Sequence, residues 1–307
     1  MSGIAAHVKD LLGVSVESMR ALGGGCVGDV RLVALNDGRR VVVKHAEADG
    51  AGALAIEGRM LGFLAKWTDV PVPMVLAEAP GLLVMEAIES GGAFGAAAQE
   101  HAAAIFAHLH NVRPMDVRWG ADEVAPEASC GDRAFGFGFD TVIGGLHQPN
   151  GWHGSWRSFF AEHRLVYMAR EAERAGRLHR ELRGRVERLA GRLEQWIDEP
   201  AHASLIHGDA WGGNILVEPS GTRVSALIDP ATSFADPEVE LAFGTLFGTF
   251  GAAFFEAYMC ARPDWNSAGF FEQRRDLYNL YPLLVHVRLF GGGYVGDVEA
   301  TLRKFGL

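Results

Sequence analysis

The hydrophobic pattern of this chain changes character once, near residues 86–92. Before that point, short apolar runs are separated by turn residues. "RLVALNDGRRVVVKHA" places two β-branched runs around Asn36-Asp37-Gly38, which predicts a hairpin, and "VPVPMVLAEAPGLLVMEAI" predicts two strands joined by a Pro-Gly turn. Between them, "GALAIEGRMLGFLAKW" has apolar residues at helical spacing. The first ninety residues therefore predict a strand-rich unit with one helix.

Helical patterns dominate after Ser90-Gly91-Gly92. "AAAQEHAAAIFAHLHNV" predicts a long helix that stops before Pro114, and "RLHRELRGRVERLAGRLEQWI" predicts an amphipathic one. The segment between them is rich in glycine and aromatic residues and is irregular until about Trp156. We expect an α+β, bilobal protein: a small β-rich N-lobe at residues 1–88 and a large, mostly helical C-lobe at residues 89–307, with ligands bound between them.

Composition excludes several classes of protein. The 307 residues are 49% hydrophobic and 21% charged, as in soluble globular proteins, and a formal net charge of -10 argues against nucleic acid as a partner. Three cysteines (Cys26, Cys130 and Cys260) have neither disulfide-framework nor zinc-type spacing. The N-terminus has no secretory pattern, and the apolar run "LAFGTLFGTFGAAFFEAYMCA" predicts a buried helical segment, not a membrane span. We expect a cytoplasmic protein with no membrane partner.

The stretch "LGGGCVGDVRLVAL" is the first candidate binding element. Its glycines fit G-x-G-x-x-G, which is a weak signal by itself. A dinucleotide-binding turn would need a helix directly afterwards, but Val30 to Leu35 has the pattern of a strand. A strand, a glycine turn and a second strand would suit a loop that covers phosphates, and a simple flexible hairpin is the alternative.

Lys44 follows the apolar run "VVV", and Glu57 lies thirteen residues later on the predicted helix. A lysine at the end of an apolar strand commonly extends to solvent. After a glycine-rich loop, however, a lysine paired with a helix glutamate is typical of proteins that hold the α- and β-phosphates of ATP.

"LIHGDAWGGNILV" places a polar turn between two apolar segments. Asp209 and Asn214 lie five residues apart, and "ALIDP" places Asp229 after the next predicted strand. Phosphoryl transfer needs a carboxylate near the attacking hydroxyl and hard oxygen ligands for Mg²⁺. An Asp/Asn-rich turn that caps local backbone groups is the alternative, but it explains none of the other features.

These residues carry a resemblance to a known family. "HGDAWGGN" followed by "IDPA" resembles the aminoglycoside phosphotransferase-like kinases, and the Trp-Gly-Gly-Asn form is similar to the fructosamine kinase (ketosamine 3-kinase) branch. The resemblance covers nearly the whole chain. It includes the "GGGC" loop, the pattern "Q-P-N-G-W…W…FF…RL" from Gln148 to Leu165 and the closing "LYNLYPLLVHVRLFGGGYVGDVEATL". It implies a protein-kinase-like fold.

The resemblance also implies ATP and Mg²⁺ as cofactors and a role for each matching residue. Asp209 would be the catalytic base, Asn214 and Asp229 would bind Mg²⁺, and Lys44 and Glu57 would form the pair that orients the phosphates. The nucleotide would also contact the glycine-rich loop and a hinge that holds adenine by backbone groups; these are Gly23, Gly24, Gly25, Cys26, Gly28, Glu86, Ala87 and Ile88.

Two residues near Asp209 have expected supporting roles. Trp211 would contact the sugar part of the substrate, unless it is a core aromatic that closes the loop. His207 would hold the loop by hydrogen bonds. Glu238 matches the family pattern, whereas Glu240 stands where aspartate is usual, and its longer side chain puts the support of the catalytic loop in doubt.

Other candidate residues are ambiguous. Cys26 is either a redox-sensitive thiol that blocks ATP or links two chains, or a small residue that fits the turn. Four residues of the middle segment could line the acceptor pocket or pack beneath it: Gln148, Asn150, Trp152 and Trp156. The three histidines of one helix are interpreted as structural: His101, His108 and His110.

The predicted function is an ATP-dependent kinase that phosphorylates the O3′ hydroxyl of a ketoamine (fructosamine or ribulosamine), either free or protein-bound. The chain would be a monomer or a redox-linked dimer. Alternatives are a kinase of another hydroxyl acceptor (aminoglycoside, choline or homoserine), a pseudokinase binding module suggested by Glu240, and an NAD-binding oxidoreductase suggested by the glycine spacing alone.

Overall fold

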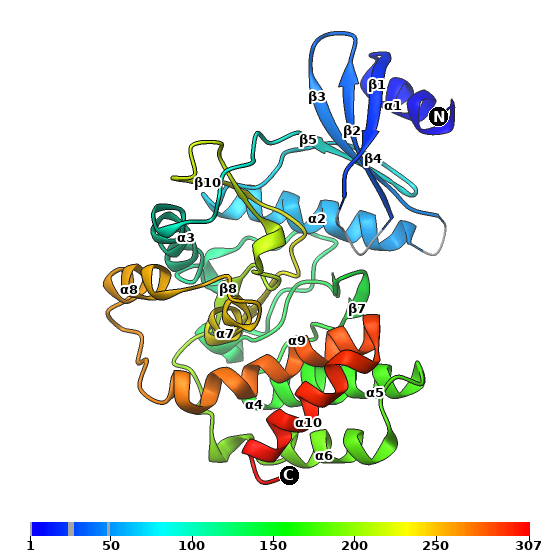
Figure 1. Cartoon of the computed structure of the whole chain (residues 1–307). Helices are drawn as coiled ribbons and strands as arrows, with labels where there is room; N and C mark the ends of the chain where they lie inside the picture. Colours follow the sequence, from blue (N-terminus) through cyan, green and yellow to red (C-terminus); the bar gives the residue numbers. More distant parts are fainter. Residues whose placement is uncertain (1, 24–27, 48–49) are drawn as a thin grey trace. The chain divides into compact units, whose positions relative to one another are not determined.

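The computed structural model describes residues 2–23, 28–47 and 50–307, which form two compact units (Figure 1). The first unit comprises residues 1–102, 141–147 and 212–231, and the second comprises residues 103–140, 148–211 and 232–307. The units interleave along the chain because the segment after the sheet pairs with a distant one: the N–H groups of Gly91 and Gly92 both donate to the carbonyl oxygen of Val217. The boundary between residues 88 and 89 stays a prediction.

A five-stranded antiparallel sheet forms the centre of the first unit, with the strand order β1-β2-β3-β5-β4. The turn between β2 and β3 is the predicted one, and Gly38 has φ +85° there. The predicted Pro-Gly turn joins β4 to β5. The strands are β1 (Val16–Ala21), β2 (Asp29–Leu35), β3 (Arg40–His45), β4 (Val75–Ala79) and β5 (Leu82–Glu86).

Both faces of this sheet are covered by helices. Strand residues alternate between faces, so Leu82 and Val84 pack with Val8 of α1 (Ser2–Leu12), whereas Leu83 and Met85 pack with α2 (Ala51–Trp67). α2 lies across the sheet in Figure 1. The strand positions that pack against these helices are apolar for that reason.

Two short hairpins complete the first unit. β9 (Ile215–Val217) pairs with β10 (Val224–Leu227), and the N–H of Leu227 donates to the carbonyl oxygen of Pro71. This bond joins the hairpin to the segment that precedes β4. The second hairpin pairs β6 (Thr141–Ile143) with β7 (Leu146–Gln148), two strands that the sequence pattern did not predict.

The second unit is mostly helical. Its central helix is α9 (Arg275–Phe290), which is buried along most of its length and packs against α5, α7 and α10. One two-stranded sheet pairs β8 (Ser204–Ile206) with β11 (Ser233–Ala235). The other α-helices are α4 (Trp156–Phe159), α5 (Tyr167–Arg174), α6 (Arg180–Ala190), α7 (Glu238–Leu246), α8 (Ala252–Ala261) and α10 (Val295–Lys304), while α3 (Ala96–Leu109) continues from the first unit into the second.

Shorter helical turns connect these elements. π-helical turns are η3 (Phe160–Val166) and η6 (Phe270–Arg274). The 3₁₀ turns are η1 (Pro114–Asp116), η2 (Ala128–Arg133), η4 (Leu193–Gln195), η5 (Gly212–Asn214) and η7 (Gly292–Tyr294).

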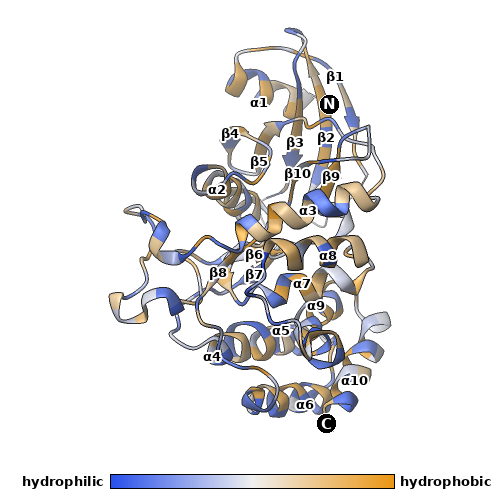
Figure 2. Ribbon diagram, turned by 90° about the vertical axis from the view of Figure 1, so that its left-hand side faces the viewer, coloured by the Kyte–Doolittle hydropathy of each residue, from blue (hydrophilic) through white to orange (hydrophobic). Residues whose placement is uncertain are grey.

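Two helical predictions differ from the structure in extent. The amphipathic helix predicted over residues 177–197 is α6 alone, because the chain leaves the helix at Gly191 (Figure 2 shows the mixed hydropathy of α6). The apolar run after Glu240 is two helices, α7 and α8, divided at Gly248, which has φ +68°. Among the described residues, no helix has the length and apolar character needed to cross a bilayer.

We predict opposite effects for two helical glycine-to-alanine substitutions. A Cβ at Gly244 of α7 would lie 2.0 Å from the ring of Phe250, and that ring is stacked on Phe254 at 3.7 Å, so it cannot yield. Gly244→Ala should lower the free energy of unfolding by about 1–3 kcal/mol through overpacking. Gly62→Ala, at an exposed position of α2 with open space, should raise it by about 0.5–1 kcal/mol. Urea unfolding measures both; equal effects would contradict the packing described at Phe250.

Candidate active site

Lys44 is a buried cation on strand β3 of the first unit. It alternates with Val41 and Val43 on β3, so its side chain points to the face that α2 covers. Glu57 lies on α2 between Leu54 and Leu61, which share one helix face and pack on the sheet. The Nζ of Lys44 donates to Glu57 Oε1 at 2.6 Å.

A second carboxylate, that of Asp229, contacts the same ammonium. Lys44 Nζ also donates to Asp229 Oδ1, 185 residues away in the chain. Lys44 and Glu57 are 6% and 7% exposed, so burial disfavours their charges. The predicted Lys44–Glu57 pair is therefore present, and Asp229 is its third member.

Burial and charge act together on this cluster. Burial lowers the pKa of Lys44, but Glu57 and Asp229 outweigh it, so the net pKa is raised and Lys44 is an ammonium. Burial raises the pKa of Glu57 to about 7, against the opposing effect of Lys44. With all three groups ionised the cluster has one surplus negative charge, and Glu57 is the member whose protonation removes it.

Asp229 and Asn214 are held together at the end of the β9–β10 hairpin. The backbone carbonyl of Asn214 accepts a bond from the N–H of Ile228 at 3.0 Å, and Asn214 is buried. Asp229 has φ +55°, the one positive value outside glycine among the described residues. Such strain persists only where surrounding contacts impose it, and it is common at functional positions. Carboxylate and amide oxygens are ligands that suit Mg²⁺.

The glycine-rich loop is described in part. Gly24, Gly25 and Cys26 lie outside the described residues, so their predicted roles are untested. Gly28 has φ +72°, and a Cβ there would lie 2.4 Å from the carbonyl oxygen of His45. The strand β2 begins directly afterwards, at Asp29. No helix follows the glycines, as a dinucleotide-binding turn requires, so the oxidoreductase alternative is wrong.

Gly28 also lines an open pocket of the first unit. The two glycines of the β6–β7 turn, Gly144 and Gly145, also line it and both have positive φ. The sequence analysis missed this turn, although the adjacent pair of glycines was its signal. The remaining residues of the pocket are Asp29, His45, Ala46, Glu47, Gly50, Ala53 and Leu146.

The predicted adenine-binding segment begins where β5 ends. The N–H of Glu86 is already bonded to the carbonyl oxygen of Met74 at 2.9 Å, so it is engaged within the sheet. Ala87 and Ile88 follow the strand and are half-buried. Ala87 and Ile88 therefore follow the last residue of β5, and their backbone groups lie outside the strand.

Asp209 lies in the second unit, on the loop that follows β8. The loop is clamped by Glu240 of α7: Oε2 accepts the N–H of His207 at 3.0 Å, and Oε1 accepts the N–H of Gly208 at 2.6 Å. Gly208 has φ +87°, a conformation that favours glycine. The ring of His207 accepts the N–H of Asp209 at 3.4 Å, in keeping with its expected role in holding the loop.

Glu240 is in turn held by a buried histidine. His110 Nε2 lies 3.0 Å from Glu240 Oε2, and His110 Nδ1 lies 2.7 Å from the hydroxyl of Tyr258. Burial lowers the pKa of His110, against the effect of Glu240, so the ring is neutral. It then donates from Nε2 to Glu240 and accepts the Tyr258 proton at Nδ1. His110 is structural, as predicted, and the doubt about Glu240 is resolved because its carboxylate reaches the loop.

Exposed aromatic rings lie beside this loop. Trp211 is 42% exposed, so the alternative of a core aromatic is wrong. Its ring is 6.4 Å from that of Phe247, which is 43% exposed, and Phe247 is 5.0 Å from the ring of His286. The sequence analysis missed Phe247 and His286, which contribute apolar faces next to Trp211.

Residues of the middle segment are held by hydrogen bonds within the second unit. Gln148 accepts a bond from the hydroxyl of Tyr281 at 2.6 Å, and Asn150 accepts one from Arg164 at 2.7 Å; all four side chains are buried. Trp156, also buried, donates to the hydroxyl of Tyr278, and Trp152 donates to the carbonyl of Val124. Burial raises the pKa of Tyr281, and the charge of Asp209 adds to that effect, opposed by Arg164.

The buried position of Glu57 predicts a pH dependence of stability. Its pKa rises from 4.5 to about 7 on folding, so folding favours the protonated form. This contribution is complete below pH 4.5 and is lost as pH rises through 7, by up to about 3 kcal/mol. The free energy of unfolding should therefore fall between pH 5 and 8 relative to Glu57→Gln, as measured by urea titration. Parallel curves for the two proteins would contradict the shift.

Comparison with known proteins places the chain among kinases of ketoamines. The family model described as "Fructosamine kinase" matches residues 1–306. A "Probable ketoamine kinase" of Synechocystis is 32% identical over 303 residues, covering 94% of this chain and 90% of the relative. The mouse ketosamine-3-kinase is 29% identical over 311 residues, covering 94% and 95%.

Solved structures agree in fold. The crystal structure of a "putative fructosamine-3-kinase" from Thermobifida fusca has a TM-score of 0.80 and 29% identity, and each chain is covered to 99%. An aminoglycoside phosphotransferase in complex with streptomycin and ATP has a TM-score of 0.66 at 13% identity, covering 99% of this chain and 96% of its own, which shows a shared fold. The protein-kinase-like α+β fold is thereby confirmed, and this chain belongs to the fructosamine kinase family.

Proposed function

We propose that this protein transfers the γ-phosphoryl group of ATP to the O3′ hydroxyl of a ketoamine. Membership of a kinase family implies ATP as the donor. The observation that carries the proposal for this chain is the convergence of Glu57 and Asp229 on the Lys44 ammonium, from a helix, a hairpin end and a strand. That arrangement matches the phosphate-orienting pair and metal carboxylate of kinases.

Asp209 is the proposed catalytic base. A carboxylate oxygen would accept the proton of the sugar hydroxyl as that oxygen attacks the γ-phosphorus. The new oxygen–phosphorus bond forms while the bond from phosphorus to the bridging oxygen breaks, and ADP leaves with the electron pair. Glu240 supports this role because it fixes the two peptide N–H groups that precede Asp209.

The first unit would hold the nucleotide. Lys44 would bind the α- and β-phosphates, with Glu57 keeping its ammonium in place. The oxygen-bearing side chains of Asn214 and Asp229 suit Mg²⁺, which when bound screens the charge of the β- and γ-phosphates. Gly23 to Gly28 would cover the phosphates, and Ala87 and Ile88 would meet adenine through backbone groups.

The acceptor would lie against exposed rings of the second unit. Trp211 and Phe247 present ring faces that can cover the C–H face of a sugar. The mouse relative is named a ketosamine-3-kinase, and an Arabidopsis relative, 29% identical over 300 residues, is named a protein-ribulosamine 3-kinase. We therefore infer a ketoamine as acceptor, as a small molecule or on a glycated protein. A cytoplasmic location and a monomer or redox-linked dimer stay predictions from the sequence.

The rival functions have weaker support. A pseudokinase module was suggested by Glu240, but the carboxylate of this residue holds the catalytic loop. An aminoglycoside phosphotransferase shares the fold at 13% identity, which supports the fold and not the same acceptor. The redox-linked dimer through Cys26 stays a prediction, since that residue lies outside the described part of the chain.

Asp209→Asn tests the catalytic role. It keeps side-chain volume but removes the proton acceptor, so kcat should fall by about 10³-fold or more while the melting temperature is unchanged. ADP release is measured with ribulose-lysine, fructose-lysine, a glycated peptide, an aminoglycoside and choline. Asp10→Asn, at an exposed position of α1, is the matched control. Turnover that survives in Asp209→Asn would refute the mechanism; turnover with choline but no ketoamine would refute the substrate class.

Glu240→Gln tests the loop clamp. The amide keeps one acceptor oxygen and turns its NH₂ group toward a backbone N–H, so at least one charge-assisted bond is lost. We expect kcat to fall by about 10–100-fold with little change in the KM for ATP. Glu256→Gln, exposed on α8, is the control. A rise in KM for ATP at constant kcat would show that Glu240 does not act through the Asp209 loop.

A further inference from the structure

Two histidine rings meet edge to edge in the second unit, away from Asp209 in the sequence and with no part in the proposed reaction. His153 Nε2 lies 2.9 Å from His163 Nε2, with the ring planes at 75°. One ring nitrogen of each histidine and a carboxylate oxygen of Glu162 all lie within 4.8 Å of one another. Two imidazoles and a carboxylate thus share one small volume at the protein surface.

The backbone holds both rings in place. His153 exchanges two backbone hydrogen bonds with Phe135, at 2.8 and 2.9 Å. Glu162 and His163 lie on the π-helical turn η3, a local distortion that is frequent at functional sites. Phe159 packs beneath both rings, with ring centroids 6.1 and 5.3 Å away. The pairing is therefore imposed by two separate elements and does not arise from one flexible loop.

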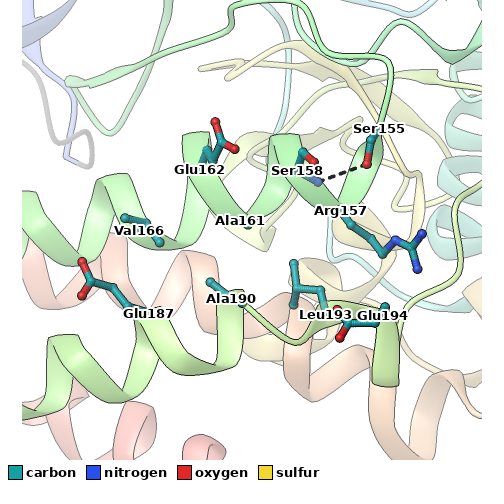
Figure 3. A pocket seen from close by; sticks show the side chains of 11 residues that line it. Ser155, Arg157, Ser158, Ala161, Glu162, Val166, Glu187, Ala190, Leu193 and Glu194 are labelled. Carbon is teal, nitrogen blue, oxygen red and sulfur yellow. Dashed lines mark hydrogen bonds between the residues drawn. The ribbon is translucent and has the colours of Figure 1, made fainter.

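There is space beside the ring of His163. Gly151 faces His163: a Cβ built there would lie 3.7 and 3.8 Å from ring atoms Cε1 and Nε2, so the missing side chain leaves space at this edge. Both histidines are half-buried and Glu162 is exposed. Figure 3 shows the Glu162 carboxylate directed away from α6, on the opposite side of its helical turn from Glu187.

We propose that His153, Glu162 and His163 bind one divalent ion of the zinc class. Two imidazole nitrogens and one carboxylate oxygen are typical of Zn²⁺, and they also suit Co²⁺ and Ni²⁺, whereas Mg²⁺ prefers oxygen ligands alone. The site is thus chemically distinct from the proposed Mg²⁺ ligands Asn214 and Asp229. A fourth position remains for water.

Metal binding requires a small local change. In the metal-free protein one Nε2 carries the proton that the other accepts. That ring must change to its Nδ1–H tautomer, so each Nε2 lone pair can point at the ion and no proton is lost. Nitrogens bound at about 2.0–2.1 Å in tetrahedral geometry lie about 3.3 Å apart, so the two rings separate by a few tenths of an ångström.

The test is Zn²⁺ titration of the full-length protein by calorimetry in buffer containing excess Mg²⁺, with Co²⁺ absorption as a report of coordination geometry. We expect one ion per chain, and at least about 30-fold weaker binding in His153→Gln and His163→Gln. His179→Gln, an exposed histidine outside the cluster, and Asp229→Asn, at the proposed nucleotide site, should bind as the natural protein does.

Three results would overturn the proposal. They are undiminished affinity in both histidine variants, loss of binding in Asp229→Asn, and loss in Cys130→Ser with retention in His163→Gln, which would assign the ion to a thiol. Melting curves without metal establish that each variant is folded. Zn²⁺ should raise the melting temperature of the natural protein but not that of His163→Gln. Because this readout needs no turnover, it stands apart from the test of the proposed function.

Discussion

The ion pairs of Lys44 are the interaction on which the first unit's candidate site depends. The lysine is 6% exposed, so its charge is tolerable only with carboxylates at hydrogen-bond distance. Removing one partner of such a pair commonly costs about 3–5 kcal/mol, because the other charge stays buried. The cluster therefore joins β3, α2 and the end of the β9–β10 hairpin, and Asp229 is held in a strained conformation as part of it. With Glu57 and Asp229 both ionised the cluster has one surplus negative charge, so it can bind a further cation.

In the second unit, the carboxylate of Glu240 holds the loop that contains Asp209. The loop before Asp209 exposes backbone N–H groups beside a buried helix, and Glu240 satisfies two of them. The neutral ring of His110 donates a hydrogen bond to Glu240 and accepts one from the hydroxyl of Tyr258 on α8. The position of Asp209 thus depends on residues of α7, of α8 and of the turn that follows α3, none of which carries out chemistry itself.

The proposed metal site at His153 and His163 shares the helical turn η3 with residues that pack within the second unit. Arg164, the next residue on η3, donates to Pro149, Asn150 and Ser233, and these bonds fix the turn. Its neighbours Glu162 and His163 point elsewhere and are available for a different ligand. The π-helical turn η3 therefore contributes Arg164 to the packing of the second unit, and Glu162 and His163 to the proposed metal site.

The sequence by itself determined the fold class and the chemical groups, because both depend on local patterns. The apolar run before Lys44 placed it at the end of a strand, helical spacing placed Glu57 on a helix, and the spacing of Asp209, Asn214 and Asp229 matched one chemistry. Only the tertiary structure decided the contacts between distant segments. That Asp229 joins Lys44, that Glu240 compensates for the usual aspartate, and that His153 meets His163 depend on packing between elements whose register no local periodicity encodes. The end of α6 at Gly191 and the division of α7 from α8 at Gly248, which has φ +68°, were likewise seen only in the structure.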